Sequence, residues 1–113
     1  MKFMLMLYAD EKAGATISPE DMAGFMGQLM AYQETLQKAG AFVSTAGLLP
    51  TTTAKTISNI DGNLQVHDGP YADTREQFGG YFMIEAPDMN EAIRLTALCP
   101  AATWGKIEIR TFA

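Results

Sequence analysis

The architecture of this chain follows from one short run, KFMLMLY, at residues 2–8. Apart from the leading lysine, every residue in the run is apolar or aromatic. A strand with one wet face alternates apolar and polar residues, whereas an unbroken apolar run is typical of a strand buried on both faces. An acid follows closely and there is no small-residue cleavage site, which argues against a signal peptide. We therefore predict a central strand here, in the middle of a sheet.

A long helix is predicted after this strand, over residues 19–39. Ser18 is a suitable N-cap, Pro19 is favoured in a first turn, and Gly40 is typical of a helix end. Apolar residues recur at helical spacing, namely Met22, Phe25, Met26, Leu29, Met30 and Leu36. Flexible methionines fill ordinary cores and also line adaptable ligand cavities. We expect the core role.

A β-hairpin is predicted further along. Two β-type runs, residues 55–60 and 63–67, flank the pair Asp61-Gly62. Both turn positions tolerate a positive φ, which a two-residue hairpin turn requires. Alternation along the second strand places His67 on the face opposite its two apolar side chains, which is either solvent or a cleft.

Three further strands and a second helix complete the pattern. We expect strands at 41–49, 79–86 and 104–112, and a helix at 89–98 with Asp88 as its capping residue. The apolar stripe of that helix is expected at Met89, Ile93 and Ala97.

The order strand, helix, strand, hairpin, strand, helix, strand predicts an α+β fold. Two strand-helix-strand units around one antiparallel sheet form a ferredoxin-like sandwich, with the hairpin inserted between the halves. Both helices then cover one face of the sheet. The other face needs cover as well, which a second subunit supplies by stacking sheet on sheet. We therefore expect a homodimer.

Composition limits the classes of function. A length of 113 residues, 48% of them hydrophobic and 19% charged, is typical of one compact domain, here residues 1–113. A net charge of -5 with only 8 Lys and Arg argues against nucleic-acid binding. One Cys and one His argue against a disulfide or a metal centre, and we expect no cofactor. No run approaches the roughly 20 apolar residues that cross a bilayer, so we expect a cytoplasmic protein without a membrane partner.

The segment richest in chemical groups is HDGPYADTREQFGG, residues 67–80. Its Asp-Gly-Pro triplet is a turn in its first role. The segment also combines possible proton acceptors, a proton donor and a bidentate anion clamp, at His67, Asp68, Asp73, Arg75 and Glu76. Asp68 and His67 are the candidate catalytic residues.

Each of these residues also has a structural interpretation. Asp68 can serve only to cap the turn, and a lone His67 on an exposed strand is commonly incidental. Arg75 and Glu76 can form a solvated ion pair or a dimer contact, which contributes about 0 to 1 kcal/mol. The candidate ligand-binding residues are Arg75, Asp73, Glu76, Tyr81 and Tyr8, with the two tyrosines supplying hydroxyls to a cleft.

Several stretches together resemble the DGPF group of YCII-related proteins. They are LYAD, SPEDM, GLLP, DGPYADTREQFGGYFMIEAPDMNEAI and CPAATWGKIEIR, and the resemblance spans nearly the whole chain. The most specific part is residues 68–85, where the pattern of that group occurs with Tyr71 for Phe, Asp73 for Glu and Arg75 for Lys.

The resemblance implies a ferredoxin-like dimeric α/β barrel with a cleft between the sheet and the connecting loops. It also implies an association with extracytoplasmic-function sigma factors, beside or fused to which such proteins are often encoded. Distant YCII relatives include an enzyme with a His-Asp pair, whose His lies on the first helix. Residues 19–39 contain no His here, so that mechanism does not carry over. His67 stands where the DGPF group commonly has other residues.

Two hypotheses remain open from the residues. In the first, the protein is an enzyme in which Asp68, with Asp73, shuttles a proton while Arg75 holds an anionic or carbonyl-bearing substrate; this expects Asp68 in a closed pocket. In the second, it is a non-catalytic module that holds a metabolite in its dimer barrel or meets a protein such as a sigma factor, which expects an exposed loop. We favour a dimeric small-molecule-binding protein, with acid-base activity left open.

Overall fold

The centre of the structure is a four-stranded antiparallel sheet. The computed structural model describes every residue, 1–113. The strands are β1 (Lys2–Ala9), β2 (Phe42–Gly47), β5 (Gln77–Glu85) and β6 (Lys106–Thr111), and their spatial order is β2-β5-β1-β6. β1 therefore lies inside the sheet with a partner on each side, which confirms the central strand predicted from its apolar run.

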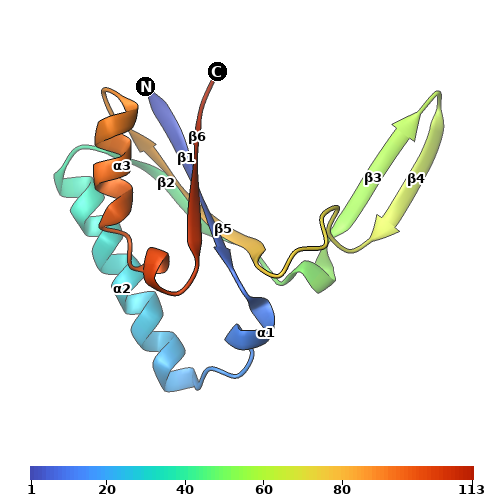
Figure 1. Cartoon of the computed structure of the whole chain (residues 1–113), viewed down its shortest axis with the longest axis horizontal. Helices are drawn as coiled ribbons and strands as arrows, with labels where there is room; N and C mark the ends of the chain where they lie inside the picture. Colours follow the sequence, from blue (N-terminus) through green and yellow to red (C-terminus); the bar gives the residue numbers. More distant parts are fainter.

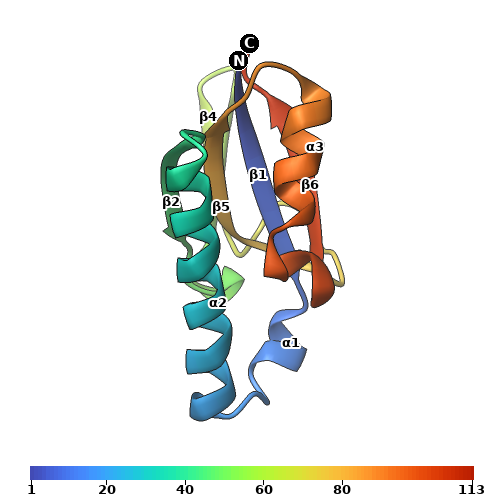
Figure 2. The same cartoon turned by 90° about the vertical axis from the view of Figure 1, so that its left-hand side faces the viewer.

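Two helices cover the same face of this sheet. They are α2 (Pro19–Lys38) and α3 (Met89–Ala97), and they lie side by side on it (Figures 1 and 2). A short helix, α1 (Glu11–Gly14), follows β1, and single 3₁₀ turns occur at Thr51–Thr53 and Pro100–Thr103. The mixed α+β arrangement with antiparallel sheets is compatible with the predicted ferredoxin-like fold. None of the three α-helices combines the length and the hydropathy that a membrane-spanning helix requires.

The predicted capping residues begin both long helices. The Ser18 hydroxyl accepts a hydrogen bond from the Asp21 backbone N–H at 3.1 Å, and Pro19 occupies the first turn of α2. The Asp88 carboxylate accepts from the Glu91 N–H at 2.8 Å at the start of α3. These bonds satisfy backbone donors that have no partner inside the helix, which is why the sequence positions of the caps located the helix starts.

The hydrophobic core lies between the sheet and the two helices. Its largest fully buried side chains are Phe3, Leu5, Leu36, Ile84 and Cys99. The Tyr32 hydroxyl donates to the Leu95 carbonyl oxygen at 2.8 Å and so satisfies its polar atom inside the core. Burial, with a smaller contribution from neighbouring Cys99, raises the Tyr32 pKa well above its usual range. Burial also raises the pKa of the Cys99 thiol.

The apolar stripe predicted for α3 is wrong. Met89 and Ile93 are exposed, and the residues that are buried instead are Ala92, Leu95 and Thr96. The small Ala92 side chain lets the helix lie close to the sheet, and the Thr96 hydroxyl donates to the Ala92 carbonyl oxygen at 2.7 Å. Because a helix can satisfy a threonine in this way, its buried face need not be its most hydrophobic one.

The core role expected for three methionines of α2 is also wrong. Met22, Met26 and Met30 are exposed, whereas Tyr32 and Leu36 further along the helix are buried. Figure 2 shows the reason: the N-terminal half of α2 extends past the end of the sheet, and only its C-terminal half lies over the strands. Met22 and Met26 belong to the overhanging half and therefore have no layer of the sheet beneath them; Met30, in the C-terminal half, is exposed as well.

The second face of the sheet has no covering layer within one chain. Its apolar residues, which we call the open face, are Met4, Met6, Tyr8, Tyr81 and Met83, and all of them are half-exposed. Alternate residues of β1, Phe3 and Leu5, face the helices and are fully buried. Within a single chain β1 is therefore buried on one face only.

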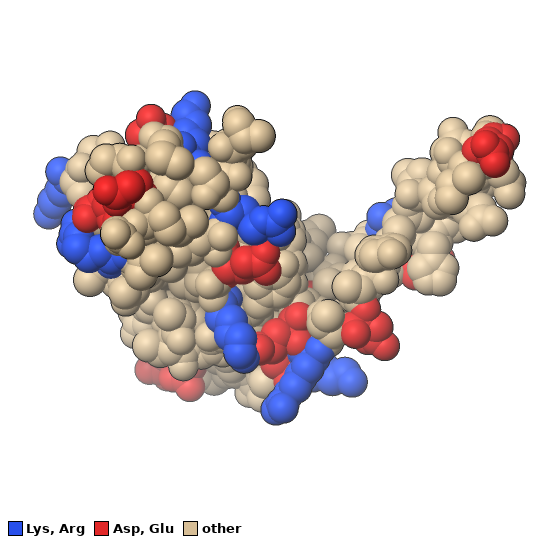
Figure 3. Space-filling model, turned by 45° about the horizontal axis from the view of Figure 1, so that its top comes forward, with Lys and Arg blue, Asp and Glu red and all other residues tan.

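The predicted hairpin forms a separate two-stranded sheet. It consists of β3 (Lys55–Ile60) and β4 (Asn63–Asp68), joined by a turn in which Asp61 and Gly62 have φ of 53° and 75°. These angles confirm the turn predicted from the Asp-Gly pair. We call residues 55–68 the arm. The arm extends away from the rest of the chain, on the side of the sheet opposite the helices (Figures 1–3).

Candidate functional site

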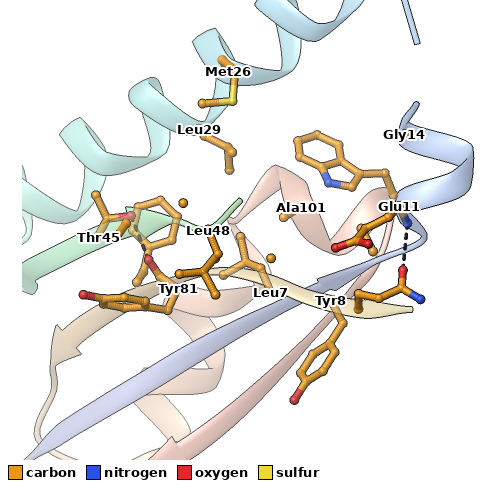
Figure 4. Close-up of a pocket in the computed structure, with 18 of the residues that line it drawn as sticks. Leu7, Tyr8, Glu11, Gly14, Met26, Leu29, Thr45, Leu48, Tyr81 and Ala101 are labelled. Atoms are coloured by element: carbon orange, nitrogen blue, oxygen red, sulfur yellow. Dashed lines mark hydrogen bonds between the residues drawn. The ribbon is translucent and has the colours of Figure 1, made fainter. Parts of the chain in front are cut away.

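A cleft opens where the overhanging half of α2 leaves the sheet. It has a volume of about 630 Å³, within the range of small-molecule sites in proteins. Its walls are the end of β1, α1, the middle of α2, the end of β2 and the start of β5. Figure 4 shows Met26 and Leu29 pointing down from the helix toward Leu7 and Leu48 on the opposite wall.

The lining of the cleft is mainly apolar. Twelve of its 21 lining residues are hydrophobic, including Phe82 in the floor and Met30 on the helix. Apolar walls favour the apolar part of a ligand by removing it from water. Met26 and Met30 add flexible thioethers that adapt to irregular shapes. Met26 and Met30 therefore fit the ligand-cavity role, which was the other interpretation of the methionines of this chain.

A hydrogen-bond network closes one end of the cleft. The Glu11 carboxylate accepts from the Thr51 N–H at 2.9 Å and from the Thr51 hydroxyl at 2.7 Å, one bond on each oxygen. The Glu11 N–H donates to the Gln77 side-chain oxygen at 2.9 Å, and the Gln77 amide nitrogen donates to the Thr74 carbonyl at 2.6 Å. The network joins α1 to both chain segments that lead into the arm.

The charge of the lining has one sign. Asp10 and Glu11 are its charged residues, and it contains no Lys or Arg. Asp10 also caps α1, since its carboxylate accepts from the N–H groups of Lys12 at 2.9 Å and Ala13 at 3.3 Å. A cleft with one sign of charge and apolar walls disfavours ligands of the same sign. Its electrostatics favour a neutral or cationic ligand over an anion.

The two glycines of the Gly-Gly pair line the cleft in different ways. A Cβ atom on Gly80 would lie 3.1 Å from the Ala46 carbonyl oxygen, so the absence of a side chain lets β5 pass close to β2. A Cβ atom on Gly79 would meet nothing within 4 Å. Gly80 therefore serves the close approach of two backbones.

Tyr8 and Tyr81, predicted as ligand-binding residues, both line the cleft. Figure 4 shows the Tyr8 ring pointing away from the helix that forms the opposite wall. This ring contacts Phe78, with the ring centroids 5.7 Å apart. Tyr81 lies opposite Met6 in the sheet register, so its ring belongs to the open face.

Arg75 and Glu76, also predicted as ligand-binding residues, line a smaller side hollow of about 370 Å³. Glu76 forms an ion pair with Lys106 there. Trp104 and Asp10 line both the side hollow and the cleft, so the two spaces adjoin. The structure therefore brings Arg75 and Glu76 to the edge of the cleft without placing them in its lining.

The structure places His67, Asp68 and Asp73 away from the cleft and from the side hollow. His67 lies opposite Thr56 on the arm, and Asp68 forms an exposed ion pair with Lys55 at the base of the arm. Asp73 is exposed in the loop that follows. None of the three lines the cleft or the side hollow within one chain.

Several lining residues had no place in the sequence prediction, above all Glu11, Gln33, Gln77 and Trp104. The segment that follows β1 holds none of the predicted site residues. A usable signal was present there, because an Asp10 cap followed by Glu11 predicts a short helical turn with a first-turn acid. Gln33 gave no such signal, since a polar residue on a long helix is ordinarily solvated.

Comparisons with known proteins identify the family of this chain. A model of the YCII-related domain matches residues 1–112. The chain is also 34% identical over 93 residues to a protein of Rhizobium meliloti (strain 1021) named "Uncharacterized protein R00369", a match that covers 82% of this chain and 75% of that protein. This chain belongs to the YCII-related family.

Proposed function

We propose that this protein is a homodimer that binds a small, largely apolar molecule of neutral or positive charge in the cleft. The observation that carries the proposal is the cleft itself, with a volume of about 630 Å³ and a mainly apolar lining. Most sites for small molecules are concave and apolar, with a few polar groups that orient the ligand. Gln33 and Thr45 are such groups here.

The roles of the lining acids favour binding over catalysis. Both oxygens of Glu11 are engaged by Thr51, and Asp10 holds the first turn of α1. A general base must reach the proton that it removes. Both oxygens of Glu11 already accept hydrogen bonds, and Oδ1 of Asp10 accepts two backbone hydrogen bonds. Asp68 and His67 stay the predicted acid-base candidates, and a catalytic role for them requires a second chain to bring an arm to a cleft.

The open face supports the homodimer. It presents five apolar or aromatic side chains, Met4, Met6, Tyr8, Tyr81 and Met83, on a sheet whose other face is covered by helices. A contiguous apolar patch of this kind marks an interaction surface. Stacking the open faces of two copies yields the dimeric α/β barrel that the sequence led us to expect.

We also infer that the chain belongs to the DGPF-type subgroup of its family. The support is the segment at 68–85, in which the subgroup pattern occurs with three conservative differences. In this chain Gln77 of the segment joins α1 to the loop that follows the arm, and Gly80 admits the close approach of β2. These contacts are a physical reason for the residue types at both positions.

A matched pair of substitutions tests the cleft. Leu48→Trp fills the cleft, whereas Leu49→Trp places the same ring on a neighbouring residue that is exposed and does not line it. A neutral hydrophobic dye is screened by fluorescence, and a library of neutral, cationic and anionic aromatic and aliphatic compounds is screened by thermal shift. A ligand that binds only the folded state at 100 times its Kd stabilises it by about 2.7 kcal/mol.

We expect ligands to raise the melting temperature of the wild type and of Leu49→Trp, but not that of Leu48→Trp. Equal shifts in both variants would place the binding site elsewhere. If no neutral or cationic compound shifts the wild type while anionic compounds do, the proposed ligand class is wrong and the side hollow beside Arg75 becomes the better candidate.

A further inference from the structure

The arm carries an apolar face that its own chain does not cover. Ile57 lies directly opposite Val66, and Leu64 lies two residues along on the same face of the ribbon. Their exposed fractions are 65%, 59% and 61%. Three large aliphatic side chains on one face of a two-stranded ribbon form a continuous apolar strip.

The arm is nevertheless held firmly at its base. The Gly69 N–H donates to the Ala54 carbonyl at 2.8 Å, and the Thr56 hydroxyl donates to the Gly69 carbonyl at 2.8 Å. The Thr51 bonds to Glu11 fix the chain just before the arm. A surface held in position before binding loses less conformational entropy when a partner arrives.

The strands of the arm gain little stability from their own pairing. An isolated two-stranded hairpin is at best marginally stable in water, so a surface that covers the apolar face of the arm would stabilise it.

We propose that the apolar face of the arm docks on a second copy of this chain, on the part outside the arm (residues 1–54 and 69–113), which we call the body. In the resulting two-fold symmetric dimer, the arm of each copy contacts the body of the other. This inference rests on the homodimer proposed above and adds its second contact. The arm extends on the side of the sheet where the open face lies, away from the helices (Figures 1 and 2). A copy stacked on the open face therefore occupies the side toward which the arm extends.

The area of the interface supports a second copy as the occupant. Strands about 4.8 Å apart that rise about 3.3 Å per residue make a four-stranded face, six residue pairs long, roughly 20 by 20 Å. Two stacked faces then bury roughly 800 Å² in total, no more than a crystal-packing contact. Stacked sheets alone are too small for a stable dimer.

The two arms supply the missing area. Each arm has two strands of six residues, so one of its faces is roughly 10 by 20 Å. Two such faces and the surfaces that they cover add roughly 800 Å², which brings the total to about 1,600 Å², the size of a standard specific interface. Symmetry provides this doubling only when the partner is the same chain.

The test compares two single substitutions on opposite faces of the arm. Leu64→Glu puts a charge on the apolar face, and Gln65→Glu puts the same charge on the next residue, which faces the other way. A third variant joins Ala54 to Gly69 through Asn-Gly in place of residues 55–68, which their hydrogen bond permits because the two ends lie close together. Dimer dissociation constants come from sedimentation equilibrium, and binding of the neutral dye is measured on every variant.

We expect a wild-type dimer that Gln65→Glu weakens less than about threefold. Leu64→Glu should weaken it by about a hundredfold, since each of the two arms loses about tenfold. The deletion should weaken the dimer at least as much as Leu64→Glu, because it removes the whole contact that the arms make. Deuterium exchange at residues 57–66 should slow as the protein concentration rises through the dissociation constant, in the wild type but not in Leu64→Glu.

Contrary outcomes separate this inference from the proposed function. A dimer that is equally tight in Leu64→Glu, or equally weakened by both charges, overturns docking of the apolar face while leaving the sheet-stacked dimer in place. A wild type that is monomeric at all concentrations overturns the docking and the homodimer together. In that case, dye binding lost only in Leu48→Trp would still support the cleft. If the deletion variant does not fold, the comparison of Leu64→Glu with Gln65→Glu alone tests whether the apolar face of the arm docks on the second copy.

Discussion

The body and the arm of this protein are built from strands of similar sequence character, yet they differ completely in burial. In β5 of the body, Phe82 and Ile84 alternate with half-exposed residues and are buried in the core. In β4 of the arm, Leu64 and Val66 alternate with polar residues in the same way, and all six residues of the strand are exposed. The same alternation therefore specifies a strand without specifying whether its apolar face is buried.

The difference lies in what each strand meets. β5 has a partner strand on both sides and two helices over one face. β4 has one partner strand and no covering layer. Burial in the body follows from the chain folding on itself, whereas the chain places no layer of its own over the apolar face of the arm. In the dimer that we propose, a second copy covers that face. The three predictions below test this contrast, and the largest effect comes first.

The largest effect on the free energy of unfolding is expected when one of two leucines, one in the body and one on the arm, is replaced by alanine. Leu36 is fully buried in the body and Leu64 is 61% exposed on the arm. Leu36→Ala should lower the free energy of unfolding by about 2–5 kcal/mol, because it removes buried methyl groups and leaves a cavity. Leu64→Ala should change it by less than about 0.5 kcal/mol in the monomer. Urea denaturation at several protein concentrations measures both.

The concentration series is the control for this pair. A loss in Leu64→Ala that grows with protein concentration reflects the dimer, because association stabilises the folded state by mass action. A large loss that is independent of concentration would mean that the arm is buried against its own body.

An intermediate effect is expected at alkaline pH, and it belongs to the body. Burial raises the pKa values of Tyr32 and Cys99 in the folded state. The folded protein therefore retains protons that the unfolded chain releases above about pH 8.5 for Cys and pH 10 for Tyr. Stability that is fully present below these values falls as the pH rises through them, by about 1.4 kcal/mol per pH unit for each such group.

Tyr32→Phe separates the contribution of Tyr32 to the alkaline loss of stability from that of Cys99. It removes the hydrogen bond to the Leu95 carbonyl, which should cost about 1 kcal/mol at pH 7, and it should flatten the loss of stability above pH 10. Urea denaturation from pH 7 to 11 measures both quantities. Leu64→Glu should leave the alkaline slope unchanged, and an equally steep slope in Tyr32→Phe would exclude Tyr32 as its source.

The smallest effect is expected for the two acid residues of the 67–80 segment that form ion pairs. Asp68 pairs with Lys55 at the base of the arm, where the Asp68 side chain is 84% exposed. Glu76 pairs with Lys106 on the body, where its side chain is 25% exposed. Asp68→Asn should change stability by less than about 0.5 kcal/mol and Glu76→Gln by about 0.5–1 kcal/mol. Thermal unfolding at low and high salt measures the stability change of both variants. A larger loss in Asp68→Asn than in Glu76→Gln would show that the ion pair of the arm is the better shielded from solvent.

Much of the fold was accessible from short segments. Ser18 and Asp88 located the starts of the two long helices, and Asp61-Gly62 located the hairpin turn, because each acts on backbone groups a few residues away. The unbroken run at 2–8 correctly predicted an inner strand. The covering of the sheet by both helices followed from the order of these elements.

The candidate site was less accessible. The 67–80 segment drew attention because it concentrates acids, a His and an Arg, yet its residues diverge to the arm, the side hollow and the cleft. The cleft is instead formed by Met26, Leu29 and Leu48, which belong to distant segments and carry no chemical signal in the sequence. A cavity arises from the relative placement of elements, and no local pattern encodes that placement.

The sequence by itself determined the order of the strands and of the two long helices, the starts of those helices and the hairpin turn, because caps, glycine turns and alternation act over a few residues. Only the tertiary structure decided which apolar side chains are buried. Met22 and Met26 are exposed because the N-terminal half of α2 extends past the sheet, and Leu64 is exposed because the arm leaves the body. Burial depends on the surface that another element presents, and that surface is set by the packing of the whole chain.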